Sequence, residues 1–372
     1  MRTRGTLRLA TRGSDLARRQ AESVAEALED RRYEVELVEV ETTGDRVRDE
    51  LIHRLGRTGA FVRALDERVM EGEADAAVHS MKDVPTELPE ALSVAGVPQR
   101  APAGDLLVTP DGASLGELPG GATVGTGSLR RRAQLLAQRP DLSVEGLRGN
   151  VDTRIEKLLA PGLQREHERR LDAAEAEGEA DGEERETFEQ SVDDWFASLS
   201  EFRRGAMERR VETEYDAVVL AEAGLRRAGL LRHVGYERLP RASFVPAAGQ
   251  GAIAVTTAAA EAETAVRDAV DHPVSRVAAT AERTVLGTLG GGCIAPIGVH
   301  ARVQGEYVNV RVQVFDADGD ERVEGTRDLP IRDHADAAVA FAEDLRERGA
   351  ADLVEAAREA ADDDATTGGE DA

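Results

Sequence analysis

Apolar positions in the first hundred residues change repeatedly from strand-like to helix-like spacing. Three short runs rich in Val, Leu and Ala are predicted strands: residues 7–11, 33–41 and 74–80. Between them, apolar side chains recur at helical spacing over residues 16–28 and 60–71, and Ser14 stands where a helix N-cap is expected. This order of strand, helix, strand, helix and strand predicts a mainly parallel sheet with helices on both faces.

A second unit of the same kind follows residues 99–104, where proline and glycine interrupt the pattern. The strands predicted for it are residues 106–109, 122–125, 142–146 and 215–220. Helices are predicted to begin at Ser128 and near Thr153. The chain therefore reads as two successive α/β units.

Residues 161–214 interrupt the second unit with 17 acidic side chains against 8 arginines. We expect poor order in the acidic middle, residues 173–186. Aromatic and apolar side chains from Phe188 to Phe202 recur at helical spacing, which predicts one amphipathic helix that needs a partner surface. We interpret this segment as an insertion with a solubilising or packing role.

The last hundred residues predict a small α+β domain. A helix over residues 276–286 precedes Gly290-Gly291-Gly292-Cys293, and Val308, Val310, Val312 and Val314 then alternate as in a strand. Residues 316–320 form a predicted turn, residues 333–359 a predicted helix, and residues 362–372 an acidic tail expected to be frayed.

The charge of the chain is strongly negative, at -25, from 72 acidic and 47 basic residues. Lys82 and Lys157 are the only lysines. Such an acid excess with almost no lysine is typical of a protein that stays solvated in very salty cytoplasm, and we expect halophily. No basic stripe points to nucleic acid. The start of the chain lacks the apolar core of a signal peptide and no run is long enough to span a membrane, so we expect a soluble cytoplasmic protein.

The fragment Val78–Pro85 carries the clearest chemical signal, because Lys82 and Asp83 follow directly after a predicted strand. Ligands of open α/β sheets bind at the carboxyl ends of strands, so this acid and base are candidate catalytic groups. Taken alone, the pair is equally compatible with a surface ion pair in a turn.

Arginines gather at other strand ends of both units. They are Arg12, Arg130, Arg131, Arg148, Arg154 and Arg227. Guanidinium groups bind carboxylates in a bidentate manner, so the set predicts a ligand with several carboxylates, although any one of them is compatible with a solvated charge. A phosphate loop, a dinucleotide fingerprint and a clustered metal motif are all missing from the sequence.

Cys293 excludes an internal disulfide because it is the only cysteine. Its glycine-rich loop would leave the sulfur unhindered, which favours a covalent attachment point over a buried structural thiol. Two alternatives stay open from the residues alone. One is a two-lobed small-anion binding protein without catalysis, and the other is a thiol enzyme with Cys293 as nucleophile.

Six separate motifs together resemble the porphobilinogen deaminase (hydroxymethylbilane synthase) family. They are Ala10–Ser14, Val78–Pro85, Gly125–Arg131, Leu147–Asn150, Pro246–Gly251 and Gly291–Cys293, in the family's order over nearly the whole chain. The resemblance implies two periplasmic-binding-protein-like α/β domains around a cleft and a small α+β C-terminal domain, in a monomer. The expected domains are residues 1–99 with 245–268, 104–244 and 273–361.

The resemblance also implies the chemistry. A dipyrromethane cofactor would be joined to Cys293 by a thioether. Four porphobilinogen units would be added head to tail with loss of ammonia, and water would release hydroxymethylbilane. Every pyrrole ring carries two carboxylates, which explains an arginine-lined cleft in an acidic protein.

Site residues follow by position in these motifs. Asp83 is the expected catalytic residue, assisting departure of ammonia and stabilising a cationic azafulvene-like intermediate. The expected cofactor-binding residues are Cys293, Lys82, Asp83, Ser128, Arg130 and Arg131. The expected substrate-binding residues are Arg12, Ser14, Gln20, Arg148, Arg154 and Arg227. One departure is the loop over residues 54–61, where Arg54 and Arg57 replace the family's usual lysines.

Overall fold

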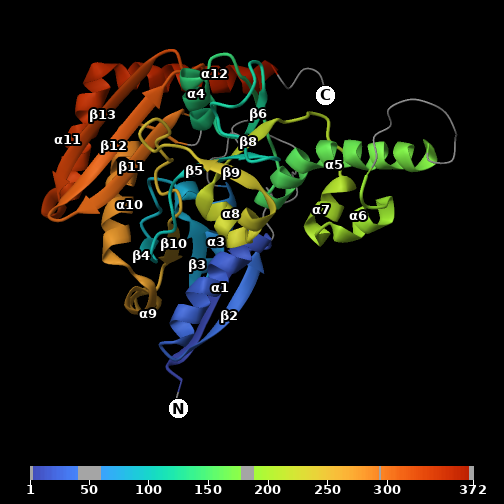
Figure 1. Cartoon of the computed structure of the whole chain (residues 1–372). Coiled ribbons are helices and arrows are strands. Elements are labelled where there is room, and N and C mark those ends of the chain that lie inside the picture. The colour runs from blue at the N-terminus through green and yellow to red at the C-terminus, as the bar shows by residue number, and fades with distance from the viewer. Residues whose placement is uncertain (1–2, 41–59, 177–187, 293–294, 368–372) are drawn as a thin grey trace.

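A pair of five-stranded sheets and a three-stranded C-terminal sheet organise the chain (Figure 1). The structure is a computed structural model that describes residues 3–40, 60–176, 188–292 and 295–367. The predictions for Arg54 and Arg57, for the acidic residues 177–187 and for Cys293 itself lie outside the described residues.

The first sheet has the strand order β2-β1-β3-β10-β4. Its members are β1 (Gly5–Arg12), β2 (Tyr33–Val40), β3 (Ala76–Ser80), β4 (Ser93–Gly96) and β10 (Ile253–Thr257). The helices beside it are α1 (Asp15–Glu29), α3 (Ala60–Met70) and α9 (Ala260–Val270). Strands β2, β1 and β3 are parallel, as predicted, but β10 runs antiparallel to β3 and β4. The segment that becomes β10 arrives from beyond the second unit, so local spacing carries no sign of this pairing.

The second sheet repeats this order as β7-β6-β8-β5-β9. Its members are β5 (Asp105–Thr109), β6 (Thr123–Thr126), β7 (Ser143–Gly146), β8 (Ala217–Ala221) and β9 (Gly235–Arg238). The associated helices are α4 (Leu129–Gln138), α5 (Val151–Ala176) and α8 (Glu222–Ala228), followed by the 3₁₀ turn η2 (Leu230–His233). Here β5 is the antiparallel strand. The chain crosses between the sheets twice, at residues 97–104 and 239–252, which we call the crossovers.

The segment over residues 161–214 differs from the prediction in two ways. Helix α5 continues without a break through Pro161, so the first part of the expected insertion is an extension of α5. The expected single helix is two, α6 (Val192–Ser198) and α7 (Glu201–Met207). Leu199 is extended and the Ser200 hydroxyl accepts a hydrogen bond from the Arg203 amide, so a new N-cap interrupts the helical periodicity.

These two short helices pack against α5, which extends away from the sheets in Figure 1. Trp195 is buried and stacks on His167 of α5, with ring centroids 5.9 Å apart. The Arg170 guanidinium lies over the rings of Trp195 and Phe188. The apolar side chains predicted to need a partner surface therefore pack against the extended α5.

The C-terminal part is the predicted α+β domain. An antiparallel sheet of β11 (Ile297–Gln304), β12 (Tyr307–Phe315) and β13 (Arg322–Pro330) packs against α10 (Pro273–Thr288), α11 (His334–Leu345) and α12 (Ala351–Thr367), with the 3₁₀ turn η3 (Ile331–Asp333) before α11. The predicted helix over residues 333–359 is broken by the π turn η4 (Arg346–Ala350), where Gly349 has φ +100°. Helix α12 continues to Thr367, into the stretch expected to be tail. The expected fold class, two α/β units and a small α+β domain, is confirmed.

Candidate active site

Polar side chains follow two adjacent strands of the first sheet. Strand β1 ends at Arg12, and the Ser14 hydroxyl caps α1. Strand β3 leads directly into the 3₁₀ turn η1 (Met81–Asp83). Because β1 and β3 are parallel neighbours, Arg12, Ser14, Lys82 and Asp83 lie at one edge of the sheet.

The turn that carries Lys82 and Asp83 is fixed by its backbone, while both side chains are exposed. The Met81 amide donates to the Ala252 carbonyl oxygen at 3.0 Å, and the Val84 amide closes the turn onto the Met81 carbonyl at 3.2 Å. Within the described residues, neither charged side chain has a hydrogen-bond partner. The structure therefore presents an accessible carboxylate and an accessible ammonium on a held turn.

The corresponding edge of the second sheet brings together the turns after β6 and β7. A Cβ atom at Gly127 would lie only 2.9 Å from the Leu147 carbonyl oxygen, so a side chain there would separate the turns. The Arg154 Nε donates to the Gly149 carbonyl at 2.8 Å. The two Nη atoms of Arg154 lie beside the same Cβ position at Gly127. Ser128 is the N-cap residue of α4, but its hydroxyl makes no capping bond to that described helix.

Three other predicted binding residues have different surroundings. Arg148 is half-buried and has no partner in the part of the chain that the structure describes. Arg227 donates from Nη2 to the Gly251 carbonyl at 2.8 Å, and burial lowers the pKa of its guanidinium. Gln20 lies on the buried face of α1. The structure thus places Gln20 inside the protein and leaves Arg148 and Arg227 without carboxylate partners among the described residues.

The two edges face each other. Helix α1 begins at the carboxyl end of β1 and α8 at the carboxyl end of β8, and these two helices pack together across the units. The bond from Arg227 on α8 to Gly251 in the second crossover adds a polar contact at the same junction. The strand ends that carry the predicted site residues of the two units therefore meet at the junction between the sheets.

Arg130 and Arg131 lie in this region, but they are buried in α4 rather than open to it. Both pair with the fully buried Asp105 at the start of β5, Arg130 Nη1 at 2.9 Å and Arg131 Nη2 at 2.8 Å. Arg131 also donates from Nε to Asp105 and from Nη1 to the Val219 carbonyl. All three Arg131 nitrogens therefore already have protein partners, an arrangement the sequence did not suggest.

This cluster holds more positive than negative charge. Burial by itself would raise the pKa of Asp105, but Arg130 and Arg131 lower it to about 2. Burial and the neighbouring Arg131 lower the pKa of Arg154 to about 10. The Nε of Arg130 is buried and has no partner among the described groups. Excess guanidinium charge and an orphaned donor fit a ligand with carboxylates, and hence the expected cofactor.

Sequence reasoning missed the residues that join this cluster to the crossovers. Gln250 donates to Asp105 Oδ1 at 2.9 Å and accepts from Arg130 Nη2 at 3.3 Å. Its own carbonyl accepts from Arg100 Nε, and Arg100 pairs with the buried Glu282 of α10 through both Nη atoms. Gln250 belongs to the quoted motif Pro246–Gly251, which is a signal that could have pointed to it. Arg100, Asp105 and Glu282 have no such local signal.

The residues that lead to Cys293 pack against α10 and α12. Gly290 has φ +72°, and Arg358 of α12 donates to its carbonyl oxygen. A Cβ atom at Gly291 would lie 2.5 Å from Ile297 Cδ1 and 2.7 Å from Leu286 Cδ1, so a side chain there would displace the ends of these two side chains. Gly291 therefore lies close to the end of α10.

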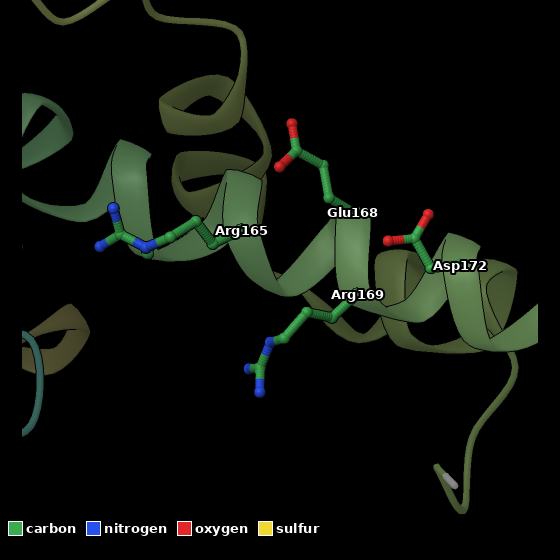
Figure 2. Close-up of a pocket in the computed structure, with 5 residues that line it drawn as sticks. Arg165, Glu168, Arg169 and Asp172 are labelled. Carbon is green, nitrogen blue, oxygen red and sulfur yellow. The ribbon is translucent and has the colours of Figure 1, made fainter. Parts of the chain in front are cut away.

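A shallow hollow on α5 lies away from these groups. Gly162, Arg165, Glu168, Arg169 and Asp172 line it, and Figure 2 shows the four labelled side chains spread along the helix without converging. It is a charged helix surface and not a candidate active site. Among the described residues, no cluster of three or more His, Cys, Asp or Glu side chains suits a metal ion, and no helix is long and apolar enough to cross a membrane.

Two facing α/β units, joined to a third domain, place more arginines than matching carboxylates among the described site residues, and this charge suits a carboxylate-rich ligand. Comparison with known proteins identifies the class further. Residues 7–167 and 200–266 match the family model "Porphobilinogen deaminase, dipyromethane cofactor binding domain", and residues 277–347 match "Porphobilinogen deaminase, C-terminal domain". The chain belongs to the porphobilinogen deaminase family.

Individual relatives agree. A "Probable porphobilinogen deaminase" of Halobacterium salinarum is 56% identical over 95% of this chain and 98% of its own length. A "Porphobilinogen deaminase" of Campylobacter hominis is 33% identical over 95% of this chain and 99% of its own. Among solved structures, the periplasmic aliphatic sulphonate binding protein SsuA from Escherichia coli covers 76% of this chain and 69% of its own with 15% identity and a TM-score of 0.32.

The family membership confirms the expected enzyme, a transferase of tetrapyrrole biosynthesis with a dipyrromethane cofactor, and does not favour a binding protein without catalysis. The matched ranges omit residues 168–199, which contain the end of α5 and all of α6. This module is therefore an addition to the part of the chain that the family model describes.

Proposed function

We propose that Asp83 is the catalytic residue of a porphobilinogen deaminase and that Lys82 binds carboxylates beside it. The observation that carries this proposal is the exposed Lys82–Asp83 pair on a turn whose backbone is held on the edge that faces the arginines of the second unit. An accessible carboxylate accepts hydrogen bonds from pyrrole N–H groups. It also stabilises the positive charge that develops on the substrate methylene carbon as the bond to the departing ammonia breaks.

The remaining polar groups bind and orient the substrate and the cofactor. We assign Arg12, Ser14, Gln20, Arg148, Arg154 and Arg227 to the substrate side of the site, and Ser128, Arg130 and Arg131 to the cofactor side. The strongest support exists for Arg154 and Arg227, because both are desolvated and neither has a carboxylate partner among the described residues. Arg130 and Arg131 contribute chiefly through their excess charge over Asp105, since every donor nitrogen except the buried Arg130 Nε already has a protein partner.

The dipyrromethane group, when bound, supplies the primer to which substrate units are joined. Cys293 would hold it by a thioether, and Gly291, two residues before it, lies close to Leu286 of α10. Water would release the finished chain.

Intact-protein mass of wild type beside Cys293→Ala tests the assignment. We expect a mass excess of two porphobilinogen units less their ammonia in wild type and none in the variant. If wild type carries no excess and gains none on incubation with porphobilinogen, the proposal is wrong. An excess that persists in Cys293→Ala would place the attachment on another residue.

We also propose the domain division and the cellular setting. Residues 1–99 with 245–268, 104–244 and 273–361 form the three domains, which the pairing of β10 with β3 and β4 supports. We propose a monomeric, cytoplasmic, halophilic enzyme, and the net charge of -25 and the Halobacterium relative support its halophily. Activity and folding should weaken when molar KCl is removed, because unscreened acidic side chains repel one another. Indifference to KCl would refute the halophilic part.

A further inference from the structure

We propose that Arg283 of α10 is a positioning residue for catalysis, because it ties the turn that carries Asp83 to the helix that leads into the cysteine loop. This inference rests on the proposed role of Asp83. Arg283 itself touches neither predicted substrate groups nor Asp83.

The contacts of Arg283 are directed at the backbone just after Asp83. Its Nη1 donates to the Val84 carbonyl at 2.7 Å, and its Nη2 donates to the Pro85 carbonyl. Burial lowers the pKa of this guanidinium, and no carboxylate in the described ranges pairs with it. A desolvated arginine without a counter-ion is costly, so its use to satisfy two successive carbonyls indicates that the fold needs this turn held.

The opposite side of the turn is held by different means. The Met81 amide bonds to the Ala252 carbonyl, and Met81 packs against Gly249, where a Cβ atom would lie 2.6 Å from Met81 Cγ. Gly249 itself has φ +72°, so the second crossover is shaped to receive Met81. The crossover therefore fixes the residue before Lys82 and Asp83, whereas α10 fixes those that follow.

Helix α10 is suited to hold the Asp83 turn in place relative to the start of the cysteine loop. It is a 16-residue helix capped by the His272 side chain with Pro273 in its first turn. Ala279 packs in one apolar cluster with Met81 and Val84, one turn before Arg283. Two residues after its last turn the chain reaches Gly290, which Arg358 holds. The Asp83 turn and the start of the cysteine loop are thus attached to one rigid element.

Arg276 on the same helix provides a matched control. It also donates to two successive carbonyls of the first unit, Val94 at 3.1 Å and Ala95 at 2.8 Å, but these belong to β4 and not to the Asp83 turn. It also pairs with Asp271. If α10 only docks onto the first unit, loss of either arginine should have similar consequences. If Arg283 positions Asp83, only its loss should slow the reaction selectively.

The experiment compares wild type, Arg283→Met, Arg283→Lys and Arg276→Met as full-length holoenzymes in molar KCl. Intact mass measures cofactor content, thermal unfolding measures stability, and steady-state porphobilinogen consumption gives kcat and KM. For Arg283→Met we expect normal cofactor mass, a kcat lower by about 10- to 100-fold and a KM within about 2-fold of wild type, because misplacing a catalytic group by about 1 Å costs this much. Arg283→Lys should recover part of kcat, since its single ammonium nitrogen can still donate to one of the two carbonyls.

Arg276→Met should keep wild-type kcat, even with a lower unfolding temperature. The proposal is overturned if Arg283→Met retains kcat, or if both methionine variants lose kcat in proportion to stability. Should Arg283→Met fail to fold, a wild-type kcat in Arg283→Lys overturns it, and a reduced kcat with normal KM and stability supports it. Near-normal turnover in Asp83→Ala would instead overturn the proposed role of Asp83, which keeps the two failures distinct.

Discussion

Asp83 and Asp105 are two aspartates at the facing edges of the two sheets, and the protein uses them in opposite ways. Asp83 follows β3, is exposed and has no partner among the described groups. Asp105 begins β5, is fully buried and accepts from Arg130, Arg131 and Gln250. One carboxylate is therefore free to act on a ligand, while the other is neutralised within the fold.

The difference lies in how many donors reach each carboxylate. A buried carboxylate stays charged only if nearby cations and N–H groups replace the water it loses, and Asp105 has two guanidinium groups for this. Asp83 keeps its water until a ligand arrives. The comparison teaches that a carboxylate at a strand end indicates a site only when its neighbours leave it accessible.

The largest effect should come from Asp83→Ala. We expect turnover of porphobilinogen to fall by about 10²- to 10⁴-fold, because the group that assists ammonia departure is lost, while unfolding in urea stays as in wild type. Glu87→Ala, an exposed carboxylate in the same loop region, is the control and should keep wild-type kcat. Near-normal turnover of Asp83→Ala would show that Asp83 is not catalytic, and the proposed difference in role between the two aspartates would then be wrong.

Asp105→Ala should instead act on stability. Removing it leaves two buried guanidinium groups unpaired, and we expect the free energy of unfolding to fall by about 3–5 kcal/mol. The control is Glu263→Ala, which breaks the exposed Arg267–Glu263 pair on α9 and should cost less than about 1 kcal/mol. Urea unfolding in molar KCl measures both, and equal effects would contradict the structural role of Asp105.

Arg154 and Arg131 test the same difference for arginines, between a side chain available to a ligand and one engaged within the fold. Arg154→Leu should raise KM or impair cofactor loading by about 10-fold or more, since a charge-assisted contact to a carboxylate is lost. Its unfolding temperature should stay equal or rise, because Arg154 is desolvated beside Arg131. Arg131→Leu should lower both stability and cofactor loading. A lower unfolding temperature for Arg154→Leu would show that Arg154 stabilises the fold through contacts within the protein.

The smallest expected effect is on the pH dependence of stability. The pKa of Asp105 is lowered from 3.8 to about 2, so its contribution is present above pH 4 and is lost as the pH falls towards 2. Urea unfolding of wild type should therefore weaken more steeply between pH 4 and 2 than that of Asp105→Asn. Parallel pH profiles would show that Asp105 is not held ionised by its arginines.

Much of the site could be predicted from local sequence. The strands before Asp83 and Ser128, the Ser14 cap and the motif Gly125–Arg131 depend on spacing and capping within a few residues. The surroundings of Arg130 and Arg131 could not, because their partner lies 25 and 26 positions away in a strand that joins the sheet antiparallel. The break between α6 and α7 was missed because Ser200 sits inside an apolar pattern that continues across it.

The sequence by itself determined which segments are helices or strands, their order and the polar groups at strand ends. Periodicity, capping and glycine turns depend only on residues a few positions apart. Only the tertiary structure decided that Asp105 pairs with two predicted ligand-binding arginines and that β10 runs antiparallel to β3 and β4. It also decided that Arg283 reaches the Asp83 turn from 198 and 199 residues away. Such partnerships form when distant segments exclude water together, and no local pattern specifies which donor will meet which acceptor.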